Sequence, residues 1–380
     1  MQDDRALSPG SASVATFAGP HIRSLAAVLD RVRDSLSNHL LGAEGYAALA
    51  AVASSLPEEI TTFWGLECRL GDQAARADLL LETRRDSRGQ ELLAGGSQLD
   101  PLCRASPTWA AVRRFSRAWS EAERPFAPFV RNLWLEFDTA ATASREAARQ
   151  ALLSPCVFLG PSPGNLAAAE LAGLLADALP LLHPTGSPVD LAPLSRMPLA
   201  GGCLFQVGLM LSRSDLGCRL CFRDLSLDDV PAWLTSGGWR GDEPSLRRVV
   251  RTLAPLTRSV AVDLSVSAAG LDERIGLECY MEWLKDDPQQ WVPLLDQLEA
   301  ERLLLPAKRE GLLAFPGVTP FAREERHSAG VTYTNLFRRI HHLKLTVGAA
   351  GIEQAKAYLA LSRPALRWTE AESRSGWFVE

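Results

Sequence analysis

The sequence lacks the long apolar runs and the excess of basic residues that mark two large classes of protein. No stretch reaches the roughly 18 consecutive apolar residues that a membrane helix needs, so no membrane insertion is expected. The opening segment MQDDRALSPGSASVATFAGP has two early acidic residues and no apolar core, unlike a signal peptide. The net charge is −5, so the chain has no overall positive field and nucleic acid is not an expected partner.

Motifs that bind nucleotides or magnesium are also missing. The chain has no G-x-G-x-x-G, P-loop or G-x-S-x-G sequence, which excludes the common phosphate loops and the nucleophile elbow. Two aspartate pairs, 228–229 and 286–287, lack the second acidic residue that a magnesium–diphosphate motif requires at a fixed spacing. The second pair precedes Pro288 and is better interpreted as a helix cap.

Cysteine is present but in no metal-binding or disulfide pattern. The seven cysteines are an odd number scattered through apolar segments, which favours a reducing, cytoplasmic location. Cys218 and Cys221 form the single C-x-x-C pair, and on a strand they would point to opposite faces. No second pair completes a zinc site, so no metal is expected.

What the sequence does contain is strand-like alternation, clearest between residues 341 and 361. His342, Lys344 and Thr346 share one face of a predicted strand, and apolar residues occupy the other face. After a turn rich in Gly and Ala, Lys356 and Tyr358 continue the polar face on a second strand. Two lysines, a tyrosine and a histidine on one face of a hairpin suit a diphosphate ligand.

The same alternation recurs along the chain in a pattern of helix, strand, strand, repeated about five times. The further predicted strand pairs are 63–70 with 75–83, 132–138 with 156–159, 204–212 with 218–223, and 260–267 with 275–282. Each strand has an apolar and a polar face, and a helix precedes each pair. The pattern predicts an α+β fold, in which about ten antiparallel strands close into a barrel with a polar lumen and a ring of helices outside.

One segment fits this scheme less directly. A predicted helix at 142–153 separates two strands that should pair, so either it is an insertion or one strand is misassigned. Residues 316–330 are expected to form a loop, and 333–340 a short helix. The predicted domain organisation is a disordered lead-in at 1–19, one barrel domain at 20–361 and a C-terminal tail at 362–380.

This architecture resembles the ABBA-type aromatic prenyltransferases, also called PT-barrel enzymes, which include indole, phenol and cyanobactin peptide prenyltransferases. The most specific local match is Lys356-Ala357-Tyr358, which is similar to the K-x-Y strand motif that holds diphosphate in the indole enzymes. Glu67 lies on the first strand, where that family often has a glutamate that accepts the acceptor's proton. The resemblance implies transfer of an isoprenoid from its diphosphate to an aromatic or peptide acceptor, in specialised metabolism. It implies no required cofactor and leaves Mg²⁺ open.

The resemblance and the alternation together assign roles to lumen residues. The expected diphosphate ligands are Arg219, Arg223, Lys344, Lys356, Tyr358 and Tyr280. Trp134 and His342 are expected to shield the allylic cation or contact the acceptor. The expected general base is Glu67, with Glu136 and Glu278 as alternatives because they repeat its local pattern.

Two alternatives stay open. The charged lumen residues could form a purely structural network of ion pairs, and the barrel could bind or otherwise modify a peptide or small molecule without prenylating it. Convergence of Arg219, Lys344, Lys356 and Tyr358 at one height would favour the enzyme. Pairing of the lysines with Glu136, Glu278 or Asp263 would favour the binding protein. His341 and His342 are adjacent and are expected to face opposite ways, so a shared metal is not expected.

Overall fold

The structure is a computed structural model that describes most of the chain. The described residues are 24–139, 144–162, 168–185, 191–197, 202–212, 217–267, 270–282, 287–327, 330–363 and 365–368. The predicted lead-in at 1–19 lies outside them, as does most of the predicted tail. Among the described residues, no helix is long and apolar enough to span a membrane.

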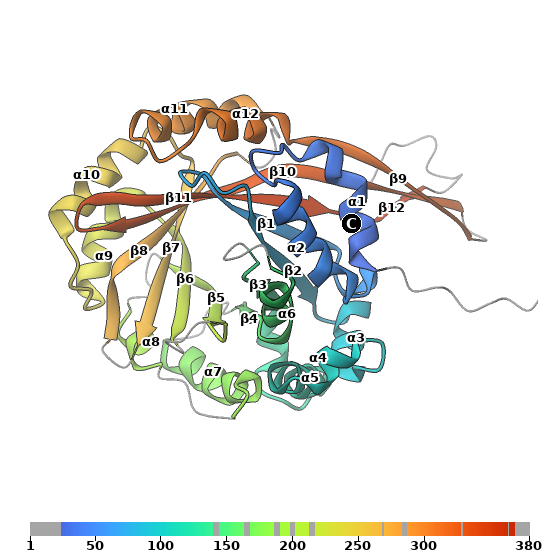
Figure 1. The fold of residues 1–380 in the computed structure, drawn as a ribbon. Coiled ribbons are helices and arrows are strands. Elements are labelled where there is room, and N and C mark those ends of the chain that lie inside the picture. The colour runs from blue at the N-terminus through green and yellow to red at the C-terminus, as the bar shows by residue number, and fades with distance from the viewer. Residues whose placement is uncertain are drawn as a thin grey trace, which may run out of the picture.

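Within the described residues, twelve strands form one antiparallel sheet, and ten of them close into a barrel in the order β1 to β8, β10, β11, with β11 returning to β1 (Figure 1). The barrel strands are β1 (Phe63–Arg69), β2 (Ala77–Arg84), β3 (Val130–Phe137), β4 (Cys156–Pro161), β5 (Cys203–Leu209), β6 (Cys218–Leu225), β7 (Ser259–Ser267), β8 (Gly270–Tyr280), β10 (Gly330–Gly348) and β11 (Gly351–Ser362). The predicted fold class is confirmed.

Helices surround the barrel and precede each strand pair (Figure 1). They are α1 (Leu25–Val32), α2 (Ala43–Ser54), α3 (Arg88–Gly95), α4 (Pro101–Ala105), α5 (Pro107–Ser120), α6 (Arg145–Leu153), α7 (Ala168–Leu182), α8 (Ala192–Arg196), α9 (Val230–Ser236), α10 (Glu243–Leu253), α11 (Val292–Ala300) and α12 (Pro306–Ala314). α6 lies between β3 and β4, which nevertheless pair with each other, so this helix is an insertion and both strand assignments hold.

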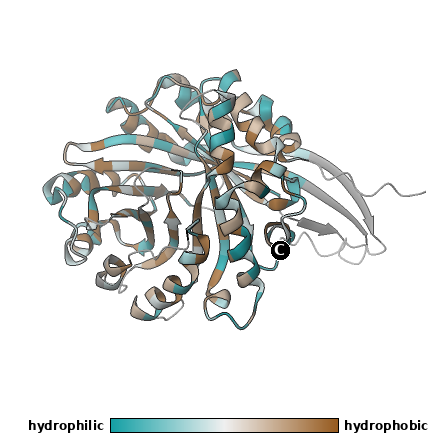
Figure 2. Ribbon diagram, turned by 60° about the horizontal axis from the view of Figure 1, so that its bottom comes forward, coloured by the Kyte–Doolittle hydropathy of each residue, from teal (hydrophilic) through white to brown (hydrophobic). Residues whose placement is uncertain are grey.

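The hydrophobic core lies between the outer face of the barrel and the helices, as the alternation predicts. On β1, Leu66 and Cys68 are buried against the helices while Glu67 faces the lumen. Helix α5 packs Trp109, Phe115 and Trp119 into this layer, at the spacing of one helical face. Apolar and polar residues alternate along the strands and helices (Figure 2).

The segment before the last hairpin was predicted wrongly. β9 (Gly317–His327) replaces the expected loop, and the first half of β10 replaces the expected helix at 333–340. The apolar spacing of Leu336, Phe337 and Ile340 resembles a helix, but the preceding run Val331–Thr334 is rich in β-branched and aromatic residues that favour strands. Pairing with β9 and with β12 (Ala365–Trp368) extends this half of β10 beyond the barrel wall (Figure 1).

Candidate functional site

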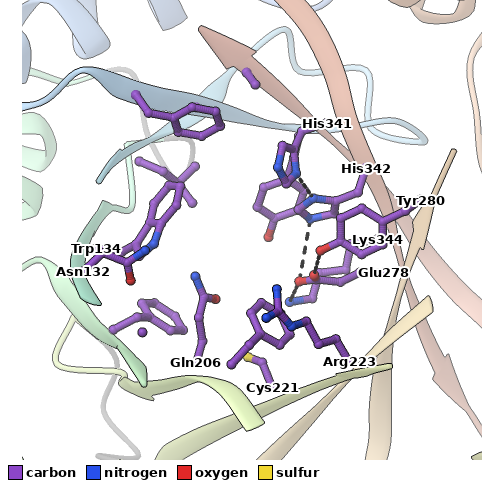
Figure 3. A pocket seen from close by; sticks show the side chains of 18 of the residues that line it. Asn132, Trp134, Gln206, Cys221, Arg223, Glu278, Tyr280, His341, His342 and Lys344 are labelled. Atoms are coloured by element: carbon purple, nitrogen blue, oxygen red, sulfur yellow. Dashed lines mark hydrogen bonds and ion pairs between the residues drawn. The ribbon is translucent and has the colours of Figure 1, made fainter. Parts of the chain in front are cut away.

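The barrel lumen contains a cavity of about 480 Å³, and each of its ten strands contributes at least one residue to the lining (Figure 3). Most of the residues predicted from the sequence line it: Trp134, Glu136, Arg219, Arg223, Glu278, Tyr280, His342, Lys344 and Tyr358. Glu67 and Lys356 are not in the lining but lie next to it, bonded to each other and to Tyr358. For these residues, the alternation predicted the inward face correctly.

Glu67 is held by two donors from β11. Lys356 Nζ lies 2.7 Å from Oε1, and the Tyr358 hydroxyl donates to Oε2. Burial by itself raises the pKa of the Glu67 carboxyl, but the charge and hydrogen bond of Lys356 and the Tyr358 bond outweigh it and lower the pKa well below its usual range. Both oxygens of Glu67 accept hydrogen bonds, and the low pKa keeps the carboxylate ionised. Glu67 is therefore suited to fixing Lys356 and Tyr358 in place.

Lys344 lies directly opposite Lys356 across the β10–β11 pairing, so each lysine needs its own counter-charge. Lys344 Nζ forms an ion pair with the Asp263 carboxylate and lies 3.6 Å from Glu278 Oε1. Gly276 permits this approach, because a Cβ there would lie 3.0 Å from both Asp263 and Lys344. Burial, followed by the charge of Arg219, lowers the pKa of Lys344 to about 7.

Three polar side chains surround the Glu278 carboxylate on one wall of the cavity, and one of them donates a hydrogen bond to it (Figure 3). The Tyr280 hydroxyl donates a 2.5 Å hydrogen bond to Oε2. His342 Nε2 and Lys344 Nζ each lie 3.6 Å from Oε1. Burial raises the pKa of Glu278 to about 7, although the Tyr280 hydrogen bond and the charge of Arg219 act to lower it.

His341 and His342 both line the cavity, which corrects the prediction that they face opposite ways. The β10–β11 register shifts between Ile340 and His342, and such a bulge places two consecutive side chains on the same side. Their Nδ1 atoms are 2.7 Å apart, so one ring donates and the other accepts. Burial lowers the pKa of His342 to about 3 and that of His341 well below its usual value, so both are neutral at neutral pH.

Aromatic rings form a continuous band around part of the lumen. The successive ring pairs, with their centroid separations, are Trp134–Phe63 at 5.6 Å, Phe63–His341 at 5.8 Å, His341–Tyr280 at 5.7 Å, Tyr280–His342 at 5.1 Å and His342–Tyr358 at 4.1 Å. Phe158 and Phe205 add to the lining. Phe63 was not among the predicted site residues, although the alternation places it on the polar face of β1.

The two arginines of β6 differ from the lysines. Arg219 makes no ion pair within the described part of the chain. The guanidinium of Arg223 lies 3.6 Å from the neighbouring Asp224, and both of these side chains are exposed to solvent. Both arginines line the cavity, so their N–H groups are the cationic donors that a ligand reaches without breaking a buried ion pair.

The two patterns proposed to separate enzyme from binding protein are each present in part. Lys344, Lys356 and Tyr358 lie side by side in the β10–β11 register, and Arg219 is close enough to Lys344 to lower its pKa. Lys344 is nevertheless paired with Asp263 and Glu278, and Lys356 with Glu67. Among the described residues, no group of three His, Cys, Asp or Glu side chains could hold a metal ion.

Comparisons with known proteins gave matches to solved structures alone. No family model matches the chain, and no curated protein does. The apo form of the prenyltransferase PriB superposes with a TM-score of 0.48 at 16% identity, covering 89% of this chain and 94% of PriB. PriB in its binary complex with product diphosphate gives 0.49 at 15% identity, with the same coverage. AnaPT from Neosartorya fischeri gives 0.47 at 13% identity, covering 90% of this chain and 92% of AnaPT.

These TM-scores, all below 0.5, give no basis for assigning a substrate or a reaction. The topology of the chain can be described independently of them. Its helix–strand–strand units build a closed antiparallel barrel of ten strands around a polar lumen. The chain therefore has the PT-barrel fold that its sequence predicts.

Proposed function

We propose that the chain transfers an isoprenoid from its diphosphate to an aromatic or peptide acceptor inside the lumen. The observation that carries the proposal is that one cavity combines the aromatic band with two arginines that have no buried carboxylate partner among the described residues. Its volume of about 480 Å³ is typical of a site for a small ligand. Asp224 and the half-exposed Arg223 mark the side open to solvent.

The chemistry required of such a site matches these residues. Arg219 and Arg223 supply charge-assisted hydrogen bonds to phosphate oxygens, and the Tyr280 hydroxyl lies on the same side of the lumen. Departure of diphosphate leaves an allylic cation, which the faces of Trp134 and Phe63 would stabilise. The acceptor ring would occupy the remaining space between the aromatic band and Glu278.

A second candidate is a barrel that binds an aromatic or peptide ligand without prenylating it. The ion pairs of Lys344 with Asp263 and of Lys356 with Glu67 favour it, because these lysines are already neutralised. A diphosphate carries about three negative charges, and it would then be held chiefly by two arginines.

Isothermal titration calorimetry with dimethylallyl diphosphate, geranyl diphosphate and pyrophosphate tests the proposal. We expect all three to bind, and Arg219→Gln to weaken each by roughly 10- to 100-fold, corresponding to about 1.5–3 kcal/mol for a hydrogen bond to a charged group. Arg124→Gln, on the outer surface near α5, serves as the matched control and should leave binding unchanged. Absence of binding by all three ligands would contradict prenyl transfer and leave the binding protein as the function.

A further inference from the structure

We propose that Glu278 is the catalytic base of the lumen, taking the proton that the acceptor's N–H or O–H releases during transfer. This inference rests on the proposed prenyl transfer. The family resemblance assigns the role of base to Glu67 instead. The repeated local pattern had left Glu136 and Glu278 as equal alternatives. The base must be a carboxylate that can both reach a ligand and hold a proton.

Glu278 is accessible from the cavity, whereas two nearby carboxylates are not. Both oxygens of Glu67 accept hydrogen bonds from β11, and Glu67 does not line the cavity. Asp263 is bound to the ammonium of Lys344 and also lies outside the lining. Glu278, in contrast, lines the cavity. Within the described part of the chain, its Oε1 accepts no hydrogen bond, because the nearest donors, His342 Nε2 and Lys344 Nζ, lie 3.6 Å away.

The surroundings of Glu278 allow it to gain and lose a proton. Facing it are Arg219 and Cys221 from β6, Asp263 from β7, Tyr280 from its own strand, His342 and Lys344 from β10, and Glu67 and Tyr358 beyond them. Glu278 is buried among these groups, and His342 beside it stays neutral. The resulting pKa of about 7 is close to the optimum for a general base at neutral pH.

The proposed step joins the acceptor to the isoprenoid and moves one proton to Glu278. The acceptor ring forms a bond to the allylic carbon, and the carbon–oxygen bond to diphosphate breaks with its electron pair leaving on the diphosphate. The N–H or O–H of the acceptor transfers its proton to Glu278 Oε1, so that the acceptor remains neutral. Tyr280 acts as a positioning residue, because its hydrogen bond to Oε2 holds the carboxylate in place and leaves Oε1 to take the proton (Figure 3).

The test compares the full-length protein with Glu278→Gln, using geranyl and dimethylallyl diphosphate with a panel of indoles, phenols and tryptophan-containing peptides. Glutamine has the same shape but cannot accept the proton. We expect diphosphate affinity in calorimetry to change by less than about threefold, while kcat falls by about 10²- to 10⁴-fold, the range for a lost general base. In the wild type, the rate should fall as pH drops below about 7, because Glu278 becomes protonated. This acid limb should be absent from the pH–rate profile of the residual activity in Glu278→Gln.

Glu136→Gln, on the opposite wall, is the comparison variant and should retain that limb. The assignment of Glu278 as the base would be overturned if Glu278→Gln kept its turnover and its acid limb, or if Glu136→Gln lost them instead. Either result would leave the proposal of prenyl transfer intact. Absence of turnover in the wild type with every donor and acceptor pair would overturn prenyl transfer and the assignment together. A normal melting temperature of each variant separates a chemical effect from misfolding.

Discussion

The hydroxyl of Tyr280 donates a 2.5 Å hydrogen bond to Glu278, two residues earlier on β8. Residues two apart on a strand point to the same face, so β8 presents donor and carboxylate together to the lumen. Burial raises the pKa of Glu278 to about 7, and this hydrogen bond acts in the opposite direction. Tyr280 itself stays protonated, because burial raises its pKa well above the usual value and the charge of Glu278 adds to this.

Replacing Tyr280 with Phe removes a bond that favours the ionised form of Glu278, so its pKa should rise. We expect a shift of about one to two units, since a hydrogen bond to a charged group is worth about 1.5–3 kcal/mol and one unit corresponds to 1.36 kcal/mol. The ionised base is then lost at a higher pH, so the acid limb of the pH–rate profile moves to higher pH. Carbon-13 NMR of labelled Glu278 measures the same pKa without turnover. An unchanged or lowered pKa would contradict the assigned role of the bond.

Lys356→Met should destabilise the fold strongly, because it leaves the Glu67 carboxylate buried without its counter-charge. Breaking one side of a buried ion pair costs about 3–5 kcal/mol. The second change Glu67→Gln should recover much of this loss, since a neutral amide then faces the apolar side chain introduced by the first change. Urea unfolding of both single variants and the double variant measures the coupling. Additive effects of the two changes would show that the pair does not contribute as a unit.

The same ion pair predicts how stability changes with acid. The pKa of Glu67 in the folded protein lies below its unfolded value, so its contribution is fully present above the unfolded pKa. That contribution should be lost as pH falls toward the folded pKa. Urea unfolding between pH 6 and 3, as an approximate window, should show a shallower decline for Glu67→Gln than for the wild type. Equal slopes would place the acid sensitivity in other groups.

The sequence predicted the barrel and its inward faces because strand alternation has a period of two and each apolar face needed helices to cover it. Glu67, Trp134 and Lys356 all lie on the lumen side for this reason. Pairing of charges could not be predicted in the same way. Glu67 meets Tyr358 only because β1 closes onto β11, almost 300 residues later, in one particular register. Alternation likewise cannot reveal the bulge that brings His341 into the lumen, since a bulge adds one unpaired residue.

Gly208 is expected to control the size of the acceptor or prenyl group. A Cβ at this position would lie 2.3 Å from the ring of Phe158, which lines the cavity, so Gly208→Ala should push the ring into the lumen. Calorimetry should show a greater loss of affinity for geranyl than for dimethylallyl diphosphate. Gly95→Ala in α3 is the control, because its Cβ would have no neighbour within 4 Å and the residue does not line the cavity. Equal losses for both ligands would argue against a steric effect of Phe158.

His342 should make the fold sensitive to mild acid. Its pKa of about 3 in the folded protein lies below the unfolded value of about 6.5, so the unfolded chain binds the extra proton at intermediate pH. Stability should therefore fall by up to about 1.4 kcal/mol per pH unit below pH 6.5 on account of this residue. His342→Gln cannot take up that proton, and its free energy of unfolding should decline less steeply between about pH 6.5 and 5. Identical slopes for the two proteins in urea titrations would show that His342 is protonated equally easily in both states, because only a difference in proton uptake between the folded and unfolded chain produces the slope.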